Sequence, residues 1–449
     1  MSLSQRIVLA VLLLVPLGFG IGLIRVRIPD QGKSNSPNDG LLSMNRIAEA
    51  YVKLVLAVGE HDPDYVDAYY GVEAWRERAK QEKKSLETIK REAAPLIAVL
   101  KSLDLSGQDE IVRLRRQYIA RQLESLTARV DMLQGAKLVF DEEARALYDV
   151  VPPKYSDAHF EEILGRVEKA LPPGDGPLYA RVERFQQEFA IPKERLSQVF
   201  SAAIEEARKR TKSHIELPTE ESFVVEYVTN KPWNAYNWYK GNFHSVIQVN
   251  TDLPIYIDRA VDLGCHEGYP GHHVYNVLLE KHMVRDRGWV EFTVYPLFGS
   301  QSLIAEGSAN YGIEVALPGA ERLSFERQVL FPLAGLDPAR VEPYYTVQKL
   351  LAELNYARNE AARRYLNGEI DAERAADWLA RYGLVSLERA RKSISFVDRY
   401  RSYVINYNLG QDLVKKYIEG KGGTAANPKK RWEEFSKLLS SPRLPSGLQ

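Results

Sequence analysis

The chain is poor in cysteine and has no excess of charge of either sign. Cys265 is the single cysteine among 449 residues, so an intrachain disulfide and a zinc ribbon are both excluded. Lysine plus arginine and aspartate plus glutamate number 60 each, which gives a formal net charge of zero. Nucleic acids are bound by basic surfaces, so this balance does not favour a nucleic-acid partner. Internal repeats and a nucleotide-binding glycine motif between a strand and a helix are also missing.

Long stretches without a charged side chain are rare in this chain. Residues 7–24, near its start, form one of them. Their 18 positions reach the lower limit for a membrane-spanning helix. No clear small-x-small cleavage site follows, so residues 1–28 are predicted to be a retained anchor rather than a cleaved signal peptide. Residues 29–42 are predicted to be a flexible linker. We therefore expect a membrane-anchored protein outside the cytoplasm, secreted if the first segment is cleaved.

From about residue 43 onwards the hydrophobic pattern is helical. Apolar side chains recur every three or four residues in many segments, as Leu196, Phe200 and Ala203 illustrate. Such stripes are typical of helix faces that pack into a core. The sequence therefore predicts a mainly α protein with one large domain over residues 43–445.

Two short segments depart from the helical pattern. Ser222–Thr229 and Ser245–Thr251 are rich in β-branched and apolar residues, which favours strands. They predict a small antiparallel sheet shortly before residue 265. A sheet edge can bind an extended peptide through backbone hydrogen bonds. A hairpin that only packs against helices agrees equally well with the two segments.

Three of the eight histidines lie in one stretch, His266-Glu267-Gly268-Tyr269-Pro270-Gly271-His272-His273. His-Glu followed closely by another His is how many zinc hydrolases combine metal ligands with a general base. The usual second histidine, four residues after the first, is replaced here by Pro270. On a regular helix His272 would face away from His266, and His273 would lie about 10.5 Å along the axis. We therefore predict a backbone bend at Pro270 and Gly271 that brings imidazoles together.

This bend would make His266 and His272 ligands of one zinc ion, with His273 as the alternative second ligand. Manganese or cobalt could occupy the same ligands. Glu267 is then the expected general base for the hydrolytic water. Asp262, one turn before His266, is a candidate for orienting a ligand histidine. Cys265 is expected to be a small buried side chain, because adjacent helical residues point in different directions.

The stretch HEGYPGHH resembles the His-Glu-x-x-Pro-Gly-His-His signature of a bacterial zincin-like family catalogued as a domain of unknown function. That family is similar to helical zinc metallopeptidases of the thermostable-carboxypeptidase and thimet-oligopeptidase type, whose motif is His-Glu-x-Gly-His. The resemblance covers about residues 220–420. It implies a large helical zincin-like (gluzincin) architecture with a small antiparallel sheet beside the active-site cleft.

The resemblance also implies a third metal ligand at Glu306, which opens Glu306-Gly307-Ser308-Ala309-Asn310-Tyr311. Glu314 follows on the same helix and is a candidate for orienting a ligand histidine. Ser308 stands where the family usually has tryptophan, so the shape of the pocket is expected to differ. Asn250 and Thr251 match an Asn-Thr pair of the family, which makes Asn250 a candidate substrate contact.

A late Tyr-x-x-Gly motif of the family is matched by Tyr407-Asn408-Leu409-Gly410. In the related peptidases a tyrosine of this helix stabilises the oxyanion, so Tyr407 is the expected catalytic tyrosine, with Tyr400 and Tyr403 as alternatives. Tyr400 is also a candidate substrate contact. Arg399 and Arg401 could bind a peptide's terminal carboxylate, which would favour carboxypeptidase action.

The expected function is a zinc-dependent hydrolase, with peptide-bond cleavage by metal-activated water favoured and carboxypeptidase action as one form of it. One alternative is a catalytically inactive metal-binding scaffold or binding protein. Another is an amidase or esterase acting on a non-peptide substrate. The expected partners are a peptide or other small amide and, through the N-terminal helix, a membrane. The domain is predicted to comprise an N-terminal helical part (43–215), a metal-site part (216–420) and a C-terminal tail helix (421–445).

Overall fold

The computed structural model describes residues 37–231 and 233–449. The predicted anchor and most of the predicted linker lie outside the described residues. The first helix, α1 (Pro37–Gly59), includes the last six linker positions, so residues 37–42 are helical rather than extended. Within the described residues, none of the helices combines the length and the apolar character needed to cross a bilayer.

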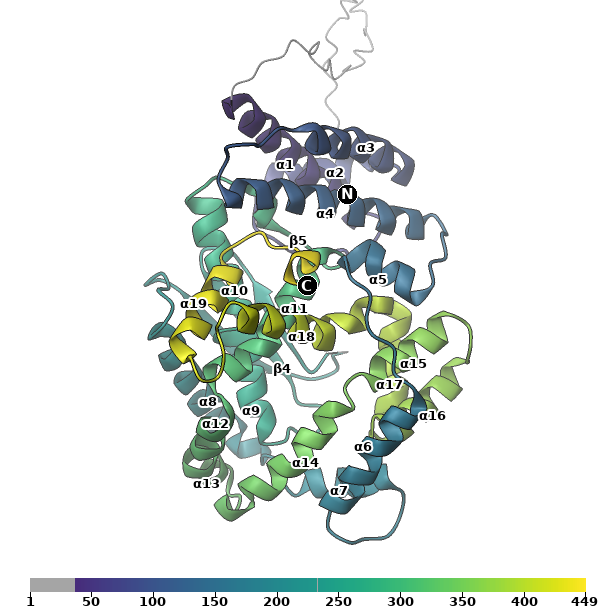
Figure 1. The fold of residues 1–449 in the computed structure, drawn as a ribbon, viewed down its shortest axis with the longest axis vertical. Helices are drawn as coiled ribbons and strands as arrows, with labels where there is room; N and C mark the ends of the chain where they lie inside the picture. Colours follow the sequence, from purple (N-terminus) through teal and green to yellow (C-terminus); the bar gives the residue numbers. More distant parts are fainter. Residues whose placement is uncertain (1–36, 232) are drawn as a thin grey trace, which may run out of the picture.

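The N-terminal helices form a layer at the top of Figure 1. Helix α4 in this layer buries Ile119, Leu123 and Leu126 on one face, as the helical spacing predicts. Ser85 caps the start of α3, because its side chain accepts a hydrogen bond from the Thr88 amide. The layer consists of α1, α2 (Glu73–Glu82), α3 (Leu86–Ser102) and α4 (Glu110–Leu133).

A short strand connects this layer to the centre of the molecule. β1 (Val66–Tyr69) pairs antiparallel with β5 (Val294–Pro296), and the register shifts between Val66 and Ala68. Such a bulge re-aims the side chain of the extra residue, which is Asp67.

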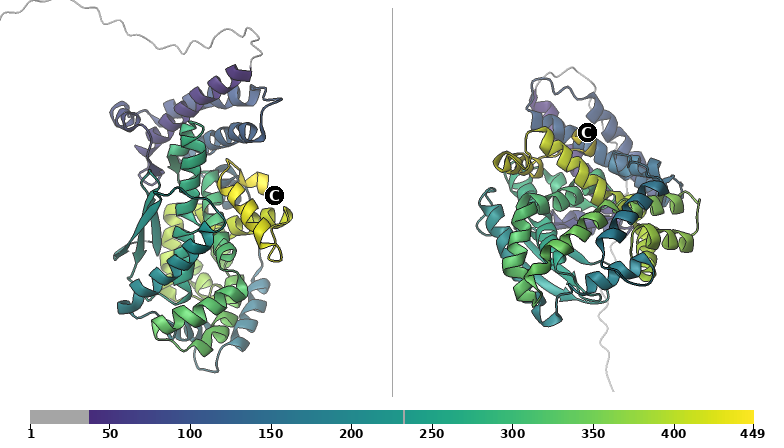
Figure 2. Two further views of the ribbon diagram at one scale, coloured as in Figure 1. Left: turned by 90° about the vertical axis from the view of Figure 1, so that its left-hand side faces the viewer. Right: turned by 60° about the horizontal axis from the view of Figure 1, so that its bottom comes forward.

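A three-stranded sheet comprises β2 (Ser222–Val228), β3 (Ala235–Tyr239) and β4 (His244–Asn250). Figure 2 shows it along one flank of the molecule. The strand order is β2-β4-β3, with β2 parallel to β4 and β3 antiparallel to β4. The two predicted strands are present, but the prediction that they pair antiparallel is wrong. The connection between them forms β3, which reverses the chain direction once more before β4 begins.

The centre of the molecule is built around α11 (Ser300–Ala316), which is buried on nearly every side. It packs against α18 (Ile405–Gly420), and both helices carry a glycine at the crossing. A Cβ on Gly307 would lie 2.3 Å from the carbonyl carbon of Gly410. Only glycine allows the two backbones to approach so closely.

The remaining helices surround this centre and share one continuous hydrophobic core with it. Figure 1 shows α15, α16 and α17 on one side of α18, α19 on the other, and α14 below. The chain is therefore mainly α, as predicted. These helices are α5 (Phe140–Tyr148), α6 (Asp157–Ala170), α7 (Leu178–Gln187), α8 (Leu196–Lys212), α9 (Asp258–Leu263), α10 (His272–Leu279), α12 (Gly319–Phe325), α13 (Phe331–Ala334), α14 (Val341–Glu353), α15 (Ala357–Leu366), α16 (Ala372–Tyr382), α17 (Leu387–Tyr400) and α19 (Pro428–Leu439).

Candidate metal centre

The backbone bends at the predicted Pro270-Gly271 pair. Helix α9 continues into a wider π-helical turn, η2 (Gly264–Gly268), and the helical path then stops until α10 begins at His272. The amide of Gly271 donates a hydrogen bond of 2.9 Å to the carbonyl of Cys265. A Cβ on Gly271 would lie 1.9 Å from the carbonyl oxygen of His266, so this close approach requires glycine.

The bend brings the two histidines of the motif to the same point, facing α11. Nε2 of His272 lies 3.1 Å from Nε2 of His266. Oε2 of Glu306 lies 3.3 Å from Nε2 of His266 and 3.7 Å from Nε2 of His272. One potential ligand atom from each side chain lies within 4.8 Å of the other two. The structure therefore brings together all three predicted metal ligands.

The environment of Glu306 fits a bound cation. Its carboxylate is buried, and Oε1 accepts a hydrogen bond of 2.9 Å from the hydroxyl of Tyr403. Oε2 is buried without a hydrogen-bond donor among the described residues, which is costly unless a cation compensates it. Two imidazole nitrogens and one carboxylate oxygen form a ligand set that zinc accepts.

The charges at this centre are strongly coupled. Burial alone would raise the pKa of Glu306, but His272 and His266 hold it well below its usual range. Burial would lower the pKa of His272, yet the nearby Glu306 raises it to about 9. In the metal-free protein a protonated His272 therefore supplies the positive charge that Glu306 requires.

Asn310 orients the first ligand and was not predicted. Its Oδ1 lies 2.9 Å from Nδ1 of His266. When Nδ1–H donates to this oxygen, the lone pair of Nε2 points towards Glu306 and His272. Asn310 lies four residues after Glu306, one turn along α11, and this spacing is the sequence signal that could have identified it.

His273 points away from the metal centre, so the alternative ligand assignment is wrong in this structure. Its Nδ1 lies 2.9 Å from the hydroxyl of Ser245, and its Nε2 lies 3.0 Å from Glu221. Consecutive residues of a helix differ in direction by about 100°. His273 therefore faces the sheet while His272 faces α11. Glu221 also accepts hydrogen bonds from Tyr269 and Arg208.

The two carboxylates predicted to orient ligand histidines are engaged elsewhere. Glu314 forms an ion pair with Lys415, at 2.9 Å. Asp262 pairs with Arg322 at 2.8 Å and with Arg259 at 3.1 Å. Glu314 lies two turns beyond Glu306, too far along α11 to reach the imidazoles. The hydrogen-bond partner of Nδ1 of His266 is Asn310 instead.

Glu267 directly follows the first ligand, is almost fully buried, and is close enough to His266, His272 and Glu306 for their charges to act on it. Burial raises the pKa of its carboxyl, although the neighbouring histidines act in the opposite direction. The backbone carbonyl of Glu267 accepts a hydrogen bond of 2.7 Å from Asn237 on β3. This bond connects the motif to the edge of the sheet. A carboxylate of raised pKa is suited to accepting a proton near neutral pH.

The start of α18 and the turn just before it place Tyr407 and Tyr403 against the metal centre. The hydroxyl of Tyr403 donates a hydrogen bond to Glu306. The Tyr407 hydroxyl has no hydrogen-bond partner among the described residues, and burial together with Glu306 raises its pKa. Tyr400 packs on Phe396 and Phe298. The Tyr400 hydroxyl also has no partner among the described residues, but of the two only Tyr407 is reached by the charges of both Glu306 and Glu267, so Tyr407 is the better candidate to contact a substrate at the metal centre.

Asp67 also faces this centre, although no motif predicted it. Burial raises the pKa of its carboxyl to about 7, and the charges of Glu306 and Glu267 act in the same direction, while His272 opposes them. The residue comes from the bulged strand β1, about two hundred positions before the histidine motif. No local pattern links the two segments, so only the tertiary structure reveals this neighbour.

The predicted substrate contacts outside the tyrosines are structural. The side-chain amide of Asn250 donates to the carbonyls of Lys231 and Trp233, which fixes the connection before β3. Arg399 pairs with Asp64, and Arg401 pairs with Glu143 at 2.6 Å. These side chains are therefore already engaged within the protein.

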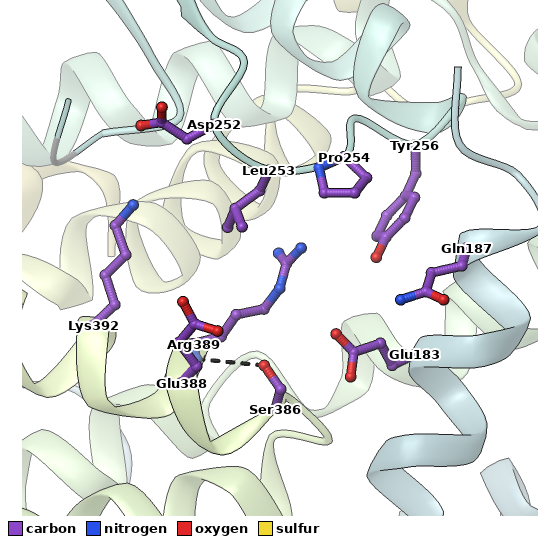
Figure 3. A pocket seen from close by; sticks show the side chains of 10 residues that line it. All are labelled: Glu183, Gln187, Asp252, Leu253, Pro254, Tyr256, Ser386, Glu388, Arg389 and Lys392. Atoms are coloured by element: carbon purple, nitrogen blue, oxygen red, sulfur yellow. Dashed lines mark hydrogen bonds between the residues drawn. The ribbon is translucent and has the colours of Figure 1, made fainter. Parts of the chain in front are cut away.

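A separate recess of about 200 Å³ lies between α7, the segment after β4 and the start of α17. Figure 3 shows the guanidinium of Arg389 pointing into this recess, with Glu183 and Tyr256 opposite. The candidate ligands His266, His272 and Glu306 do not line it. It is a distinct feature from the metal centre.

No protein-family model matches this sequence, and no curated protein matches it either. Two predicted lipoproteins are among the solved structures that are similar to the chain. A predicted lipoprotein from Colwellia psychrerythraea is 13% identical, with a TM-score of 0.47 over 81% of this chain and 68% of that one. A predicted lipoprotein of unknown function from Shewanella oneidensis is 14% identical, with a TM-score of 0.44 over 84% of this chain and 75% of that one.

Proposed function

We propose that this protein is a zinc-dependent hydrolase of the gluzincin type and that it cleaves peptide bonds. The observation that carries the proposal is the convergence of His266, His272 and Glu306 on one point, with a buried carboxylate oxygen that lacks a donor. Glu267, which directly follows the first ligand, is buried near the same side chains and has a raised pKa. This combination of three ligands and one free carboxylate is typical of hydrolytic rather than structural zinc sites.

His266, His272 and Glu306 would hold the ion, and zinc bound there would supply Lewis-acid activation of water and of the substrate carbonyl. Glu267 would take the proton from the attacking water and return it to the leaving amine. The hydroxyl of Tyr407 would donate a hydrogen bond to the developing oxyanion. Tyr403 and Asn310 would keep Glu306 and His266 in position.

The sheet provides support for a peptide substrate. Among the described strands β3 pairs only with β4, so no strand is hydrogen-bonded to its other edge. Asn237 on this strand is hydrogen-bonded to the backbone of Glu267, so the open edge lies next to the proposed base. An extended peptide could add to such an edge through backbone hydrogen bonds. The uncharged residues 7–24 would hold the catalytic domain at the outer face of a membrane.

The test is metal analysis of the purified protein together with hydrolysis of a panel of short peptides, blocked and free at each end. We expect one zinc ion per chain, its loss in a His266→Ala/His272→Ala variant, and peptide cleavage by the zinc-loaded protein. Glu267→Gln should keep zinc and lose cleavage, whereas Glu314→Gln, which removes only the ion pair with Lys415, should keep both. A protein that binds zinc and cleaves none of the peptides would refute the peptidase proposal. Cleavage restricted to non-peptide esters or amides would do the same.

A further inference from the structure

The recess of Figure 3 is lined by three segments that lie far apart in the sequence. Glu183 and Gln187 come from α7, Tyr256 from the segment between β4 and α9, and Arg389 from the first turn of α17. Figure 3 shows the polar ends of these four side chains, a carboxylate, an amide, a hydroxyl and a guanidinium, directed towards one central space. A ligand in this space would therefore meet a cation on one wall and an anion on another.

Two of the walls are joined by the backbone, so the recess is present without a ligand. Tyr256 forms an antiparallel bridge with Ala190, which lies shortly after α7. The amide of Ile191 also donates a hydrogen bond of 2.8 Å to the carbonyl of Ile255. These contacts hold Tyr256 and the end of α7 at a fixed spacing, and a preformed site loses little affinity to rearrangement.

Neither of the two charges that face the recess is neutralised within the protein. Arg389 and Glu183 are both half-buried, and among residues 37–231 and 233–449 neither side chain takes part in an ion pair or a hydrogen bond. The guanidinium of Arg389 lies 5.9 Å from the centre of the Tyr256 ring. Partial burial weakens the hydration of both groups, which strengthens their attraction for charges on a ligand. An anion alone would be repelled by Glu183 and a cation alone by Arg389, so a ligand that carries both charges is favoured.

The remaining charges of the recess lie at its rim. Glu388, Lys392 and Asp252 are exposed to solvent, which screens their charges. Asp252 accepts hydrogen bonds of 3.0 and 2.9 Å from the Asn230 amide, and Figure 3 shows Lys392 and Asp252 away from the central space. These side chains therefore affect the approach of a ligand more than its bound position.

The volume and the apolar part of the lining restrict the ligand to a small molecule. A volume of about 200 Å³ is less than the roughly 300–1,000 Å³ of pockets for drug-sized ligands. Leu253, Pro254 and the ring of Tyr256 give the recess an apolar wall. A ligand of this size that has one positive group, one negative group and an apolar part is a single amino acid.

We propose that this recess binds a free amino acid with an apolar side chain. The carboxylate of the amino acid pairs with Arg389, whose guanidinium matches two carboxylate oxygens with a pair of parallel hydrogen bonds. Its ammonium group pairs with Glu183, and its side chain lies against Leu253 and the Tyr256 ring. Because none of the candidate metal ligands lines the recess, this site is separate from the metal centre and does not require hydrolase activity.

The experiment measures binding of four probes to the protein by isothermal titration calorimetry. The probes are L-leucine, N-acetyl-L-leucine, which lacks the ammonium charge, L-leucinamide, which lacks the carboxylate, and the dipeptide dileucine. We expect leucine to bind about ten- to a hundredfold more tightly than either singly charged analogue, because each analogue loses one set of charge-assisted hydrogen bonds. Dileucine should bind more weakly than leucine, because its charged ends are further apart and its volume is larger.

Two variants assign the two charges of the ligand to their partners. Arg389→Gln should remove the preference for leucine over leucinamide, and Glu183→Gln should remove the preference for leucine over N-acetyl-leucine. Arg391→Gln is the matched control, since Arg391 lies on the same helix as Arg389, pairs with Glu373 at 2.9 Å and does not line the recess. Because neither Arg389 nor Glu183 is paired within the protein, both variants should unfold at the temperature of the parent, which circular dichroism measures.

A variant without the metal ligands separates this site from the metal centre. His266→Ala/His272→Ala should bind leucine as the parent does, and loss of leucine binding in a folded form of this variant would place the amino acid at the metal centre and overturn the inference.

Several other results would also overturn it. These are no binding of leucine at millimolar concentration, equal binding of leucine and either analogue, binding of dileucine as tight as that of leucine, a preference that survives Arg389→Gln or Glu183→Gln, and a preference lost in Arg391→Gln. None of these results depends on whether the protein cleaves peptides. Failure of the amino-acid site and failure of the hydrolase proposal are therefore distinguishable.

Discussion

The side-chain amide of Asn310 donates a hydrogen bond of 2.9 Å to the backbone carbonyl of Tyr407. The oxygen of the same amide lies 2.9 Å from Nδ1 of His266. One residue of α11 therefore fixes both a candidate metal ligand and the turn of α18 that carries the candidate oxyanion donor. The metal site and the tyrosine are expected to respond together to a change at Asn310.

Asn310→Ala should lower zinc affinity about ten- to a hundredfold, because His266 loses the partner that fixes its tautomer and ring orientation. Competition with a chromogenic chelator measures the change. Ser308→Ala on the same helix is the control, since the Ser308 hydroxyl bonds only to the carbonyl of Ala305 within α11. Unchanged zinc affinity in Asn310→Ala would contradict the assigned role.

His273→Ala should retain one zinc ion per chain, whereas His272→Ala should lose it. The two residues are adjacent, but His273 bonds to Ser245 and Glu221 below the sheet and His272 faces Glu306. Removing His273 leaves buried polar groups without partners, so we expect a loss of about 1–3 kcal/mol in unfolding free energy. Elemental analysis measures the zinc content, and urea unfolding measures the loss of stability. If His273→Ala lost zinc while its fold stayed intact, His273 and not His272 would be favoured as the second ligand.

Tyr407→Phe and Tyr403→Phe should affect different quantities. The Tyr407 hydroxyl is available to a substrate, so its loss should lower kcat about a hundredfold with little change in zinc affinity. The Tyr403 hydroxyl supports Glu306, so its loss should weaken zinc binding first. Steady-state kinetics at saturating zinc, together with chelator competition, separates the two. If Tyr403→Phe lowered kcat and Tyr407→Phe did not, Tyr403 would be the oxyanion donor and Tyr407 would not.

The sequence predicted the convergence of His266 and His272 because it depends on local geometry. A proline and a glycine at positions 270 and 271 exclude a regular helix, and few conformations remain that bring His266 and His272 together. The resemblance to a known signature supplied Glu306. The choice between His272 and His273 needed the position of β4 and Glu221, because either histidine can face the first once the helix is broken.

Other features could not be obtained from local patterns. Asp67 comes from β1, a segment far from the motif in sequence, and only the packing of the domain brings it near the metal centre. The partners of Glu314 and Asp262 are likewise set by neighbouring helices. The sequence does not predict the parallel pairing of β2 with β4, because that pairing depends on β3, a five-residue strand that contains Asn237 and no β-branched residue.

Zinc binding should release a proton between pH 6.5 and 9. The pKa of His272 is raised to about 9 in the metal-free protein, so this imidazole is protonated at neutral pH and must lose its proton to become a ligand. Apparent zinc affinity should therefore rise about tenfold per pH unit up to about pH 9. Calorimetric titration in two buffers of different ionisation enthalpy counts the protons. A raised pKa also stabilises the metal-free fold below pH 6.5, and this contribution is lost as the pH rises through 9.

The contact between Gly307 and Gly410 determines how closely α18 approaches α11, and it provides the most direct test of the proposed assembly. Gly307→Ala would place a Cβ 2.3 Å from the backbone of Gly410, so the helices must separate. We expect a loss of about 1–3 kcal/mol in unfolding free energy. Zinc affinity should fall as well, because Tyr403 and the backbone of Tyr407 withdraw from Glu306 and Asn310.

Gly165→Ala is the matched control for this substitution. Gly165 lies inside α6 with no atom near the position of an added Cβ, so alanine there should stabilise the protein by about 0.5–1 kcal/mol through helix propensity. Chemical unfolding and chelator competition on both variants give the comparison. If Gly307→Ala retained full zinc affinity while losing stability, Tyr403, which lies just before α18, would not be what holds Glu306 in place, and the metal centre would depend on α11 and the histidine motif alone.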